Sequence, residues 1–164
     1  DHGIRDPLWS RGLGDVYKRQ PLFLWAGVDT WLRHYDRSQP RMKVTHSLST
    51  IDDSYFTIVL NTNPYTYLGS RPLSLAPHAT LSNGLSVVAL RTMSFKTMLG
   101  LLKDLFEGKP LENCDAVHVA NDLAELSIGG HSPFPYQLDG DYLGEVNHLD
   151  FSWRPNILRL VIPT

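Results

Sequence analysis

The sequence lacks the residues on which disulfide-rich, thiolate-metal and membrane-spanning proteins depend. It holds a single cysteine, Cys114, which excludes a disulfide framework within the chain and a cysteine-based metal cluster. No two of the seven histidines stand at zinc-ligand spacing from each other. No uninterrupted apolar run reaches the roughly 18 residues that a membrane-spanning helix needs. An ordinary hydrophobic core is therefore expected, and a hydrophobic content of 42% is enough to form one.

An excess of charge of one sign is also absent. The 15 basic and 17 acidic residues nearly balance, which argues against a nucleic-acid-binding protein with a basic face. The sequence has no glycine-rich phosphate loop and no nucleophile elbow. A self-contained phosphotransferase is excluded, because nothing in the chain could hold a triphosphate. The lone cysteine is typical of a reduced, cytoplasmic setting.

The first 20 residues are expected to be foreign to the domain. Ser10 to Gln20 reads as the translation of a transposase sequencing adaptor, and Gly3 to Asp6 resembles the translated end of a flow-cell primer. We therefore expect residues 1–20 to be a non-native, disordered segment. Residues 21–164 have the length of one domain and would be an open fragment of a longer gene.

The first half of this domain is expected to contain one helix and several strands. Apolar residues at helical spacing predict an amphipathic helix over residues 22–36. Strands are predicted over residues 42–48 and 55–60, separated by a turn at Asp52 to Ser54. Because residues 55–60 form a continuous β-branched and aromatic run, we expect that strand to be buried on both faces.

Turn chemistry then interrupts the pattern before a second helix. Residues 61–69 are predicted to form a structured loop, and residues 71–77 an extended arm whose two prolines deny it ladder hydrogen bonds. Residues 82–84 predict a tight turn into a strand over residues 85–90. The next helix begins at its cap Ser94 and is ended by Gly108 and Pro110. Its apolar stripe is expected to be core, and comprises Phe95, Met98, Leu99, Leu102, Leu105 and Phe106.

The remainder of the chain predicts short strands only. They are expected near residues 116–120, 123–128, 134–138, 142–150 and 157–162, with a hairpin turn at Asp139-Gly140. Many short strands with one or two packed helices predict a mostly-β α+β domain that resembles a β-sandwich. Five histidines are interpreted as surface or hydrogen-bonded structural residues, namely His46, His78, His118, His131 and His148.

The chemical feature of this pattern is Gln137-Leu138-Asp139-Gly140-Asp141, where two carboxylates flank a glycine at a strand end. The alternative interpretation is a hairpin turn in which aspartate and glycine only satisfy the backbone geometry. The residues by themselves leave both interpretations open.

Three stretches together resemble the C-terminal domain of the diacylglycerol/sphingosine kinase family, especially its actinobacterial branch. They are residues 61–72, residues 76–85 and residues 137–141, in that order and at those spacings, followed by the closing run 158–163. The resemblance covers essentially all of residues 21–164. It implies a two-domain lipid kinase, in which an N-terminal domain with a Gly-Gly-Asp-Gly motif binds ATP and a β-sandwich domain follows. This sequence contains no Gly-Gly-Asp-Gly, so residues 21–164 would be the β-sandwich domain without its nucleotide-binding half.

The resemblance also implies roles for particular residues. The family's Asp-Gly-Glu motif supplies a catalytic acidic residue, and the matching position is Asp141, within a turn that Asp139 and Gly140 would hold. Aspartate is one methylene shorter than glutamate, and misplacement of this order can cost about a hundredfold in rate. Tyr65, Tyr67 and Leu68 are candidate lipid contacts, with packing at the edge of the sandwich as the alternative for each tyrosine.

Cofactors and partners follow from the same resemblance. ATP and Mg²⁺ would be held mainly by the missing half. The auxiliary magnesium loop of bacterial relatives aligns with Ser82, Asn83 and Ser86, whose neutral oxygens cannot offset magnesium dehydration, so no metal is expected there. The implied partners are a lipid substrate, a membrane surface at the cytoplasmic face, the missing domain and a second copy of the chain. The fragment alone should be inactive, and the alternatives are a non-catalytic lipid-binding or scaffolding module and an NAD kinase-like domain.

Overall fold

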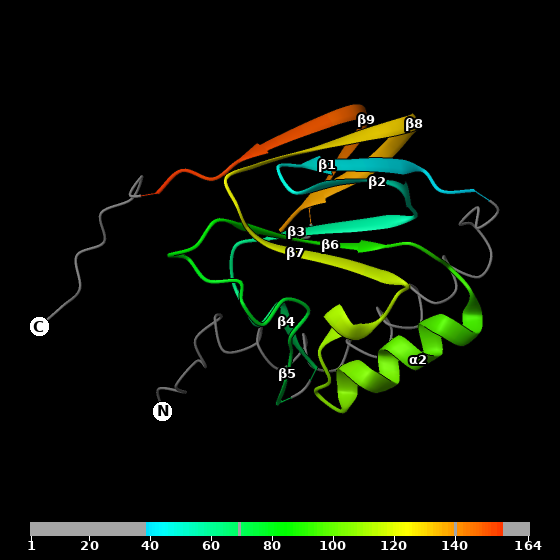
Figure 1. The fold of residues 1–164 in the computed structure, drawn as a ribbon, viewed down its shortest axis with the longest axis vertical. Coiled ribbons are helices and arrows are strands. Elements are labelled where there is room, and N and C mark those ends of the chain that lie inside the picture. The colour runs from blue at the N-terminus through cyan, green and yellow to red at the C-terminus, as the bar shows by residue number, and fades with distance from the viewer. Residues whose placement is uncertain (1–38, 69, 140, 156–164) are drawn as a thin grey trace, which may run out of the picture. The chain divides into compact units, whose positions relative to one another are not determined.

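The computed structural model describes residues 39–68, 70–139 and 141–155 (Figure 1). The chain divides into two units, residues 1–36 and residues 37–164, and the described residues all belong to the second. The segment 1–20, the helix predicted over residues 22–36 and the strand predicted over residues 157–162 lie outside the described residues. No helix in the described part of the chain has the length and apolar character of a membrane span.

The described residues form three antiparallel sheets, one α-helix and one short 3₁₀ helix. The four-stranded sheet has the order β2 (Ser49–Ser54), β1 (Met42–His46), β8 (Glu125–Leu138), β9 (Asp141–Ser152). The three-stranded sheet has the order β3 (Phe56–Leu60), β6 (Leu85–Leu90), β7 (Val117–Leu123). A two-stranded sheet pairs β4 (Thr66–Leu68) with β5 (Arg71–Leu73), and the helices are α2 (Phe95–Phe106) and η1 (Leu111–Asn113).

The main core lies between the four-stranded and the three-stranded sheet. Val44 of β1, Val87 of β6 and Leu123 of β7 are almost fully buried in one cluster with Ile128 and Phe134 of β8. Burying a side chain of this size contributes about 1.5–3 kcal/mol, as an upper estimate. The two sheets therefore pack face to face as a β-sandwich, and the predicted mostly-β α+β fold is confirmed.

A second core covers the other face of the three-stranded sheet. Val88 of β6 and Val117 of β7 pack there against Leu101 of α2, Leu111 of η1 and the segment that contains Ala76 and Ala79. Val88 thus points away from its neighbours Val87 and Ala89, as alternation along a strand requires. The apolar run from Val87 to Leu90 in β6 follows from the central place of this strand in its sheet, with both faces buried.

Two predictions about the first strands are wrong. Asp52 to Ser54 belong to β2, and the turn before this strand lies instead at Ser47-Leu48. Residues 56–60 form β3 at one edge of its sheet within the described part of the chain, and none of its side chains is fully buried. The two aspartates of β2 have side-chain partners on other strands or segments. Asp52 lies 3.3 Å from Lys43 of β1, and Asp53 forms an ion pair with Arg91.

The segment before β6 also differs in part from its prediction. Arg71 to Leu73 is not an unpaired arm, because it pairs with Thr66 to Leu68, and Pro72 lies opposite Tyr67 in a ladder of three pairs. The tight turn before β6 is confirmed, and the backbone N–H of Asn83 donates to the carbonyl of Thr80 at 3.2 Å.

The second predicted helix is confirmed as α2, but the prediction of its buried side is wrong. Leu101 is the buried residue of this helix. Four members of the predicted stripe have exposed fractions between 44% and 60%, namely Phe95, Leu99, Leu102 and Phe106. Ser94 occupies the N-cap position without a side-chain cap hydrogen bond, whereas Gly108 has the positive φ of 73° typical of a helix end.

Candidate functional site

The β8–β9 hairpin carries the predicted acidic residues at its tip. β8 ends at Leu138, β9 begins at Asp141, and these two residues lie opposite each other across the ladder. Asp139 has a φ of 51°, the left-handed conformation that the first residue of a two-residue type I′ hairpin turn requires. Aspartate tolerates this conformation better than most residues, so the predicted hairpin turn is confirmed. Gly140 lies outside the described residues.

The tip of the β8–β9 hairpin exposes both carboxylates and apolar side chains. Asp139 and Asp141 are both exposed to solvent. Leu138, Tyr142 and Leu143 have exposed fractions of 62%, 68% and 50%. Because directly opposed residues of a ladder point to the same face, the side chain of Leu138 shares a face with the carboxylate of Asp141. These three apolar side chains were not predicted as site residues, although Leu138 belongs to the acidic motif and Tyr142 and Leu143 directly follow it.

A bend in β8 sets the direction of this tip. Gly129 pairs with His148 and Phe134 with Val146, so four residues of β8 oppose a single residue of β9. β1 pairs with β8 only from Leu126 to Gly130. Beyond the bend, the hairpin is therefore a two-stranded ribbon (β8 and β9 in Figure 1), which Phe134 anchors in the main core at 4% exposure.

The bend depends on the absence of a side chain at position 130. A Cβ atom at Gly130 would lie 2.5 Å from Cδ1 of Phe134 and would collide with the backbone oxygen of Ser132. The Phe134 ring and the backbone of Ser132 thus occupy the space of the missing side chain. At Gly129, by contrast, the nearest atom is Nδ1 of His148 at 3.7 Å, which is an ordinary contact.

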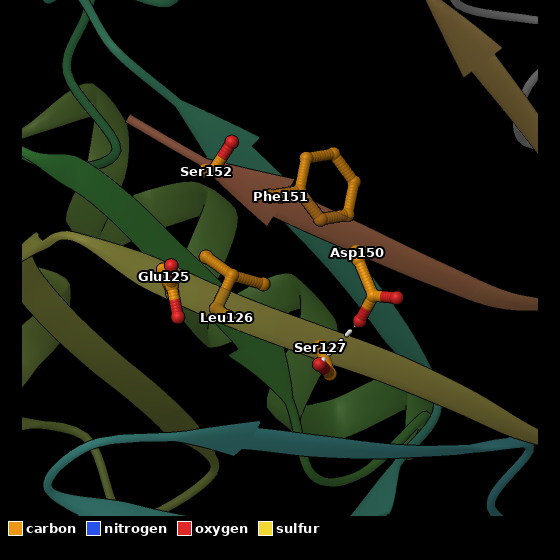
Figure 2. Close-up of a pocket in the computed structure, with 6 residues that line it drawn as sticks. All are labelled: Glu125, Leu126, Ser127, Asp150, Phe151 and Ser152. Carbon is orange, nitrogen blue, oxygen red and sulfur yellow. Dashed lines mark hydrogen bonds between the residues drawn. The ribbon is translucent and has the colours of Figure 1, made fainter. Parts of the chain in front are cut away.

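A shallow hollow of about 230 Å³ lies at the opposite end of the same hairpin (Figure 2). It is lined by Glu125, Leu126, Ser127, Asp150, Phe151 and Ser152. The hydroxyl of Ser127 donates to the Asp150 carboxylate at 2.6 Å, and Nε2 of His148 lies 2.9 Å from the same oxygen. These two contacts, the serine first, lower the pKa of Asp150.

Ser127, Asp150 and His148 do not form a catalytic triad that would activate the serine as a nucleophile. In a serine hydrolase, histidine lies between serine and aspartate and takes the serine proton. Here the carboxylate of Asp150 lies between Ser127 and His148, so the serine has no neighbouring base in this arrangement. The side chains of His148 and Asp150 are 55% and 71% exposed, and we interpret the group as a solvated surface network.

A second hollow, of about 250 Å³, lies between β5 and the end of α2. Its walls are Arg71 to Leu73 on one side and Leu105 to Gly108 on the other. Tyr67, the predicted lipid contact, lies opposite Pro72 of this wall and is 56% exposed, and Tyr65 is 45% exposed. Both tyrosines belong to the β4–β5 region rather than to the sheet that carries Asp141, and neither hollow is lined by Asp141.

The polar groups around the loop predicted to align with a magnesium site form hydrogen bonds within the protein. Ser86 is 1% exposed, and its hydroxyl donates to Oδ1 of Asn121 at 2.8 Å. The backbone N–H of Gly84 donates to Oδ1 of Asp122 at 2.9 Å. Within the described ranges, no group of three or more histidine, cysteine, aspartate or glutamate side chains is arranged to hold a metal ion.

A pairing of two histidines was also not predicted from the sequence. Nε2 of His46 in β1 lies 3.0 Å from Nε2 of His118 in β7, although 72 residues separate them in sequence. The signal for His46 was present in the alternation of Met42-Lys43-Val44-Thr45-His46, which places His46 on the buried face of β1. The identity of its partner depends on the packing of the two sheets, which no local pattern encodes.

Comparison with known proteins gives a likeness of fold. No family model matches the sequence, and no curated protein matches it either. Among solved structures, a candidate diacylglycerol kinase from Bacillus anthracis str. Sterne matches with a TM-score of 0.50 and 16% sequence identity, over 80% of this chain and 47% of that one. Two further structures of diacylglycerol kinases from the same organism, one of them a candidate, give TM-scores of 0.49 and 0.48, with 15% and 16% identity, over 79% of this chain and 48% and 45% of theirs. The chain thus spans about half the length of these proteins, and it shares its fold with part of a candidate diacylglycerol kinase.

Proposed function

We propose that this chain is the acceptor-side half of an ATP-dependent lipid kinase of the diacylglycerol kinase type. The observation that carries the proposal is the exposed carboxylate of Asp141 at a hairpin tip, beside the exposed apolar side chains of Leu138, Tyr142 and Leu143. The fold shared with part of a candidate diacylglycerol kinase supports it. An acidic residue among exposed apolar side chains suits an acceptor that has one polar hydroxyl and a large apolar body.

The proposed chemistry assigns one step to this chain. The carboxylate of Asp141 accepts the proton of the lipid hydroxyl as the hydroxyl oxygen bonds to the γ-phosphorus of ATP. The bond from that phosphorus to the bridging oxygen breaks, ADP leaves, and the proton passes from Asp141 to solvent. Mg²⁺ bound with ATP neutralises phosphate charge in such reactions, and we assign both to the nucleotide-binding half. A general base contributes typically 10²–10⁴-fold to such a rate.

The lipid body is assigned to the neighbours of Asp141. A hydroxyl within hydrogen-bonding reach of Asp141 brings the rest of its molecule to the same face of the tip, where Leu138 lies. Asp139 holds the turn and takes no part in proton transfer. Tyr65 and Tyr67 are proposed as more distant lipid contacts, at a membrane surface against which the whole enzyme would work. Leu68 remains a predicted lipid contact, and its side chain lies outside the described part of the structure.

The proposal is tested on the full-length protein, expressed from the complete gene. Radiolabelled ATP is offered with phosphatidylcholine vesicles that contain diacylglycerol, with vesicles that contain sphingosine, and with NAD in solution. Transfer of label to a lipid is the expected result. Label in NAD alone would favour the NAD kinase-like alternative. A folded protein that transfers label to no acceptor, yet sediments with the vesicles, would favour the alternative of a non-catalytic lipid-binding module.

A further inference from the structure

The His46–His118 contact joins the two sheets of the sandwich at one end of the main core. His46 is the last residue of β1, on the same face as Met42 and Val44, and is 8% exposed. His118 lies opposite Ala89 in the three-stranded sheet, on the face that packs against β1. The contact therefore links strands that share no backbone ladder.

The two rings meet head to head. Their Nε2 atoms are 3.0 Å apart, their centres are 5.3 Å apart and their planes differ by 25°. A separation of 5.3 Å is as large as two imidazole rings can reach when their nitrogens are 3.0 Å apart. Both Nε2 atoms consequently lie close to the line that joins the ring centres, with the lone pair or hydrogen of each directed at the other.

This arrangement holds a hydrogen rather than a metal ion. A metal midway between the nitrogens would lie at half of the 3.0 Å separation, which is shorter than the zinc–nitrogen bond of about 2.0–2.1 Å. A separation of 3.0 Å is instead ordinary for a hydrogen bond. One ring must donate and the other accept, because two N–H groups would repel each other and two lone pairs would leave the contact without a hydrogen.

A third contact indicates which ring donates. The backbone N–H of Leu48 donates to Nδ1 of His46 at 3.4 Å, so this nitrogen carries no hydrogen. Neutral His46 therefore has its hydrogen on Nε2 and donates to Nε2 of His118. The hydroxyl of Ser49 lies 3.1 Å from Nε2 of His46. An added proton has two places to go. On Nδ1 of His46 it meets the Leu48 N–H, and on Nε2 of His118 it meets the hydrogen of His46, so each route breaks one hydrogen bond.

The surroundings also oppose protonation. Burial lowers the pKa of His46. Burial lowers the pKa of His118 as well, followed by the charges of His46 and of Arg91, which follows β6. Asp53 of β2 accepts hydrogen bonds from two nitrogens of Arg91, and the charge of Asp115, which precedes β7, also acts on Arg91. From β8, the apolar Leu126 lies opposite His46. In the described part of the chain, the charge of Arg91 acts on His118 directly, whereas the neighbouring carboxylates act on Arg91.

We propose that the His46–His118 contact is an acid-sensitive latch, which in its neutral state ties the turn between β1 and β2 to the three-stranded sheet and which opens when the pair takes up a proton. Opening frees the Ser47-Leu48 turn and loosens β2, which is an edge strand of its sheet. Because both rings have lowered pKa values, the stability that they contribute is present above the unfolded value of 6.5 and is lost as the pH falls below it.

The latch is tested by urea unfolding of this chain between pH 8 and pH 5. For each histidine that stays neutral in the folded state, the unfolding equilibrium constant should rise by up to about tenfold per pH unit below the unfolded pKa. The double variant His46→Gln, His118→Gln should remove most of this rise. The control is His78→Gln, which removes one exposed imidazole outside both β1 and β2. A double variant that loses no more pH dependence than this control would overturn the proposal.

A second measurement needs no substitution. Long-range nitrogen NMR spectra of the histidine rings at pH 8 should show the hydrogen of His46 on Nε2 and that of His118 on Nδ1. Titration should move both rings together, with the amide signals of Ser47 and Leu48 shifting in the same pH range. A hydrogen on Nδ1 of His46, or amide signals of the turn that stay constant while the rings titrate, would contradict the latch.

Discussion

Replacing Gly130 by alanine should destabilise the sandwich and disturb the hairpin that carries Asp141. The new Cβ would lie 2.5 Å from Cδ1 of Phe134 and would collide with the backbone oxygen of Ser132. The ring is 4% exposed and held in the core, so it cannot swing into solvent, and a backbone oxygen moves only if the chain moves. Overpacking of this kind costs typically 1–3 kcal/mol. Since two neighbours must shift, we expect a loss of about 2–3 kcal/mol in the free energy of unfolding.

The matched control is Gly129→Ala, one position earlier in the same strand. Its Cβ would meet only Nδ1 of His148, at 3.7 Å. Alanine is favoured over glycine in a strand interior by roughly 0.5–1 kcal/mol, so this variant should be as stable as the parent or slightly more stable. Urea unfolding followed by far-ultraviolet circular dichroism measures both variants. Equal stability of the two alanine variants would refute the account of the bend.

A double variant separates the two collisions. Phe134→Leu in the Gly130→Ala background removes the ring that meets the new Cβ and leaves the Ser132 oxygen in place. The two changes should therefore be non-additive, with a coupling of roughly 0.5–3 kcal/mol in a double-mutant cycle. Additive losses would mean that the ring does not occupy the space of the missing side chain.

Three further predictions concern the rest of the sandwich. Gly84→Ala should cost about 3 kcal/mol in urea unfolding, because its Cβ would lie 2.6–2.8 Å from backbone atoms of Asp122 and Leu123, whereas Gly100→Ala in α2, with no atom within 4 Å, should be neutral or stabilising. Leu101→Ala should cost about 2–5 kcal/mol, because this side chain is buried, and Leu99→Ala, which is 59% exposed, should stay within about 0.5 kcal/mol; similar losses would contradict the packing of α2. Asp53→Asn should cost less than about 1 kcal/mol, because its pair with Arg91 is half exposed. Arg91 lowers the pKa of Asp53, so this small contribution is present above the unfolded value of 3.8 and is lost as the pH falls below it; a parent-to-variant difference that persists at pH 2 would contradict this origin.

The parts of the fold that could be predicted from sequence are those with local signals. Gly108 at a positive φ ends α2, the sequence Asp139-Gly140 marks the hairpin turn, and the turn residues before position 85 mark the start of the strand that forms β6. In each case the conformation is set within a few residues, so the sequence pattern and the structure agree.

The parts that were mispredicted depend on distant partners. Asp52 and Asp53 are typical turn residues, but they lie in a strand, where they form ion pairs with Lys43 and Arg91. Ser54, by contrast, has local partners: its hydroxyl donates to the backbone oxygen of Phe56 and lies 2.8 Å from the hydroxyl of Thr57. A fully buried serine is thus satisfied where the chain passes from one sheet to the other.

The buried side of α2 could not be predicted from its apolar stripe alone. Helical spacing correctly predicted an amphipathic helix, but spacing does not say which part of a broad apolar face meets the sheet. Leu101 is buried, while Leu99 and Leu102 on either side are exposed. The His46–His118 contact was missed because it is decided by the packing of the two sheets.

The central claim, that Asp141 takes the proton of a lipid hydroxyl, is tested most directly by the turnover rate of the full-length protein on diacylglycerol in vesicles, for Asp141→Asn, Asp141→Glu and Asp139→Asn. The Asp141→Asn variant keeps the shape of the side chain without its basicity, so its kcat should fall by about 10²–10⁴-fold. The Asp141→Glu variant keeps a carboxylate and should retain measurable turnover, and Asp139→Asn should remain close to the parent. A kcat for Asp141→Asn within a fewfold of the parent, in a protein that unfolds at the same urea concentration, would contradict the claim.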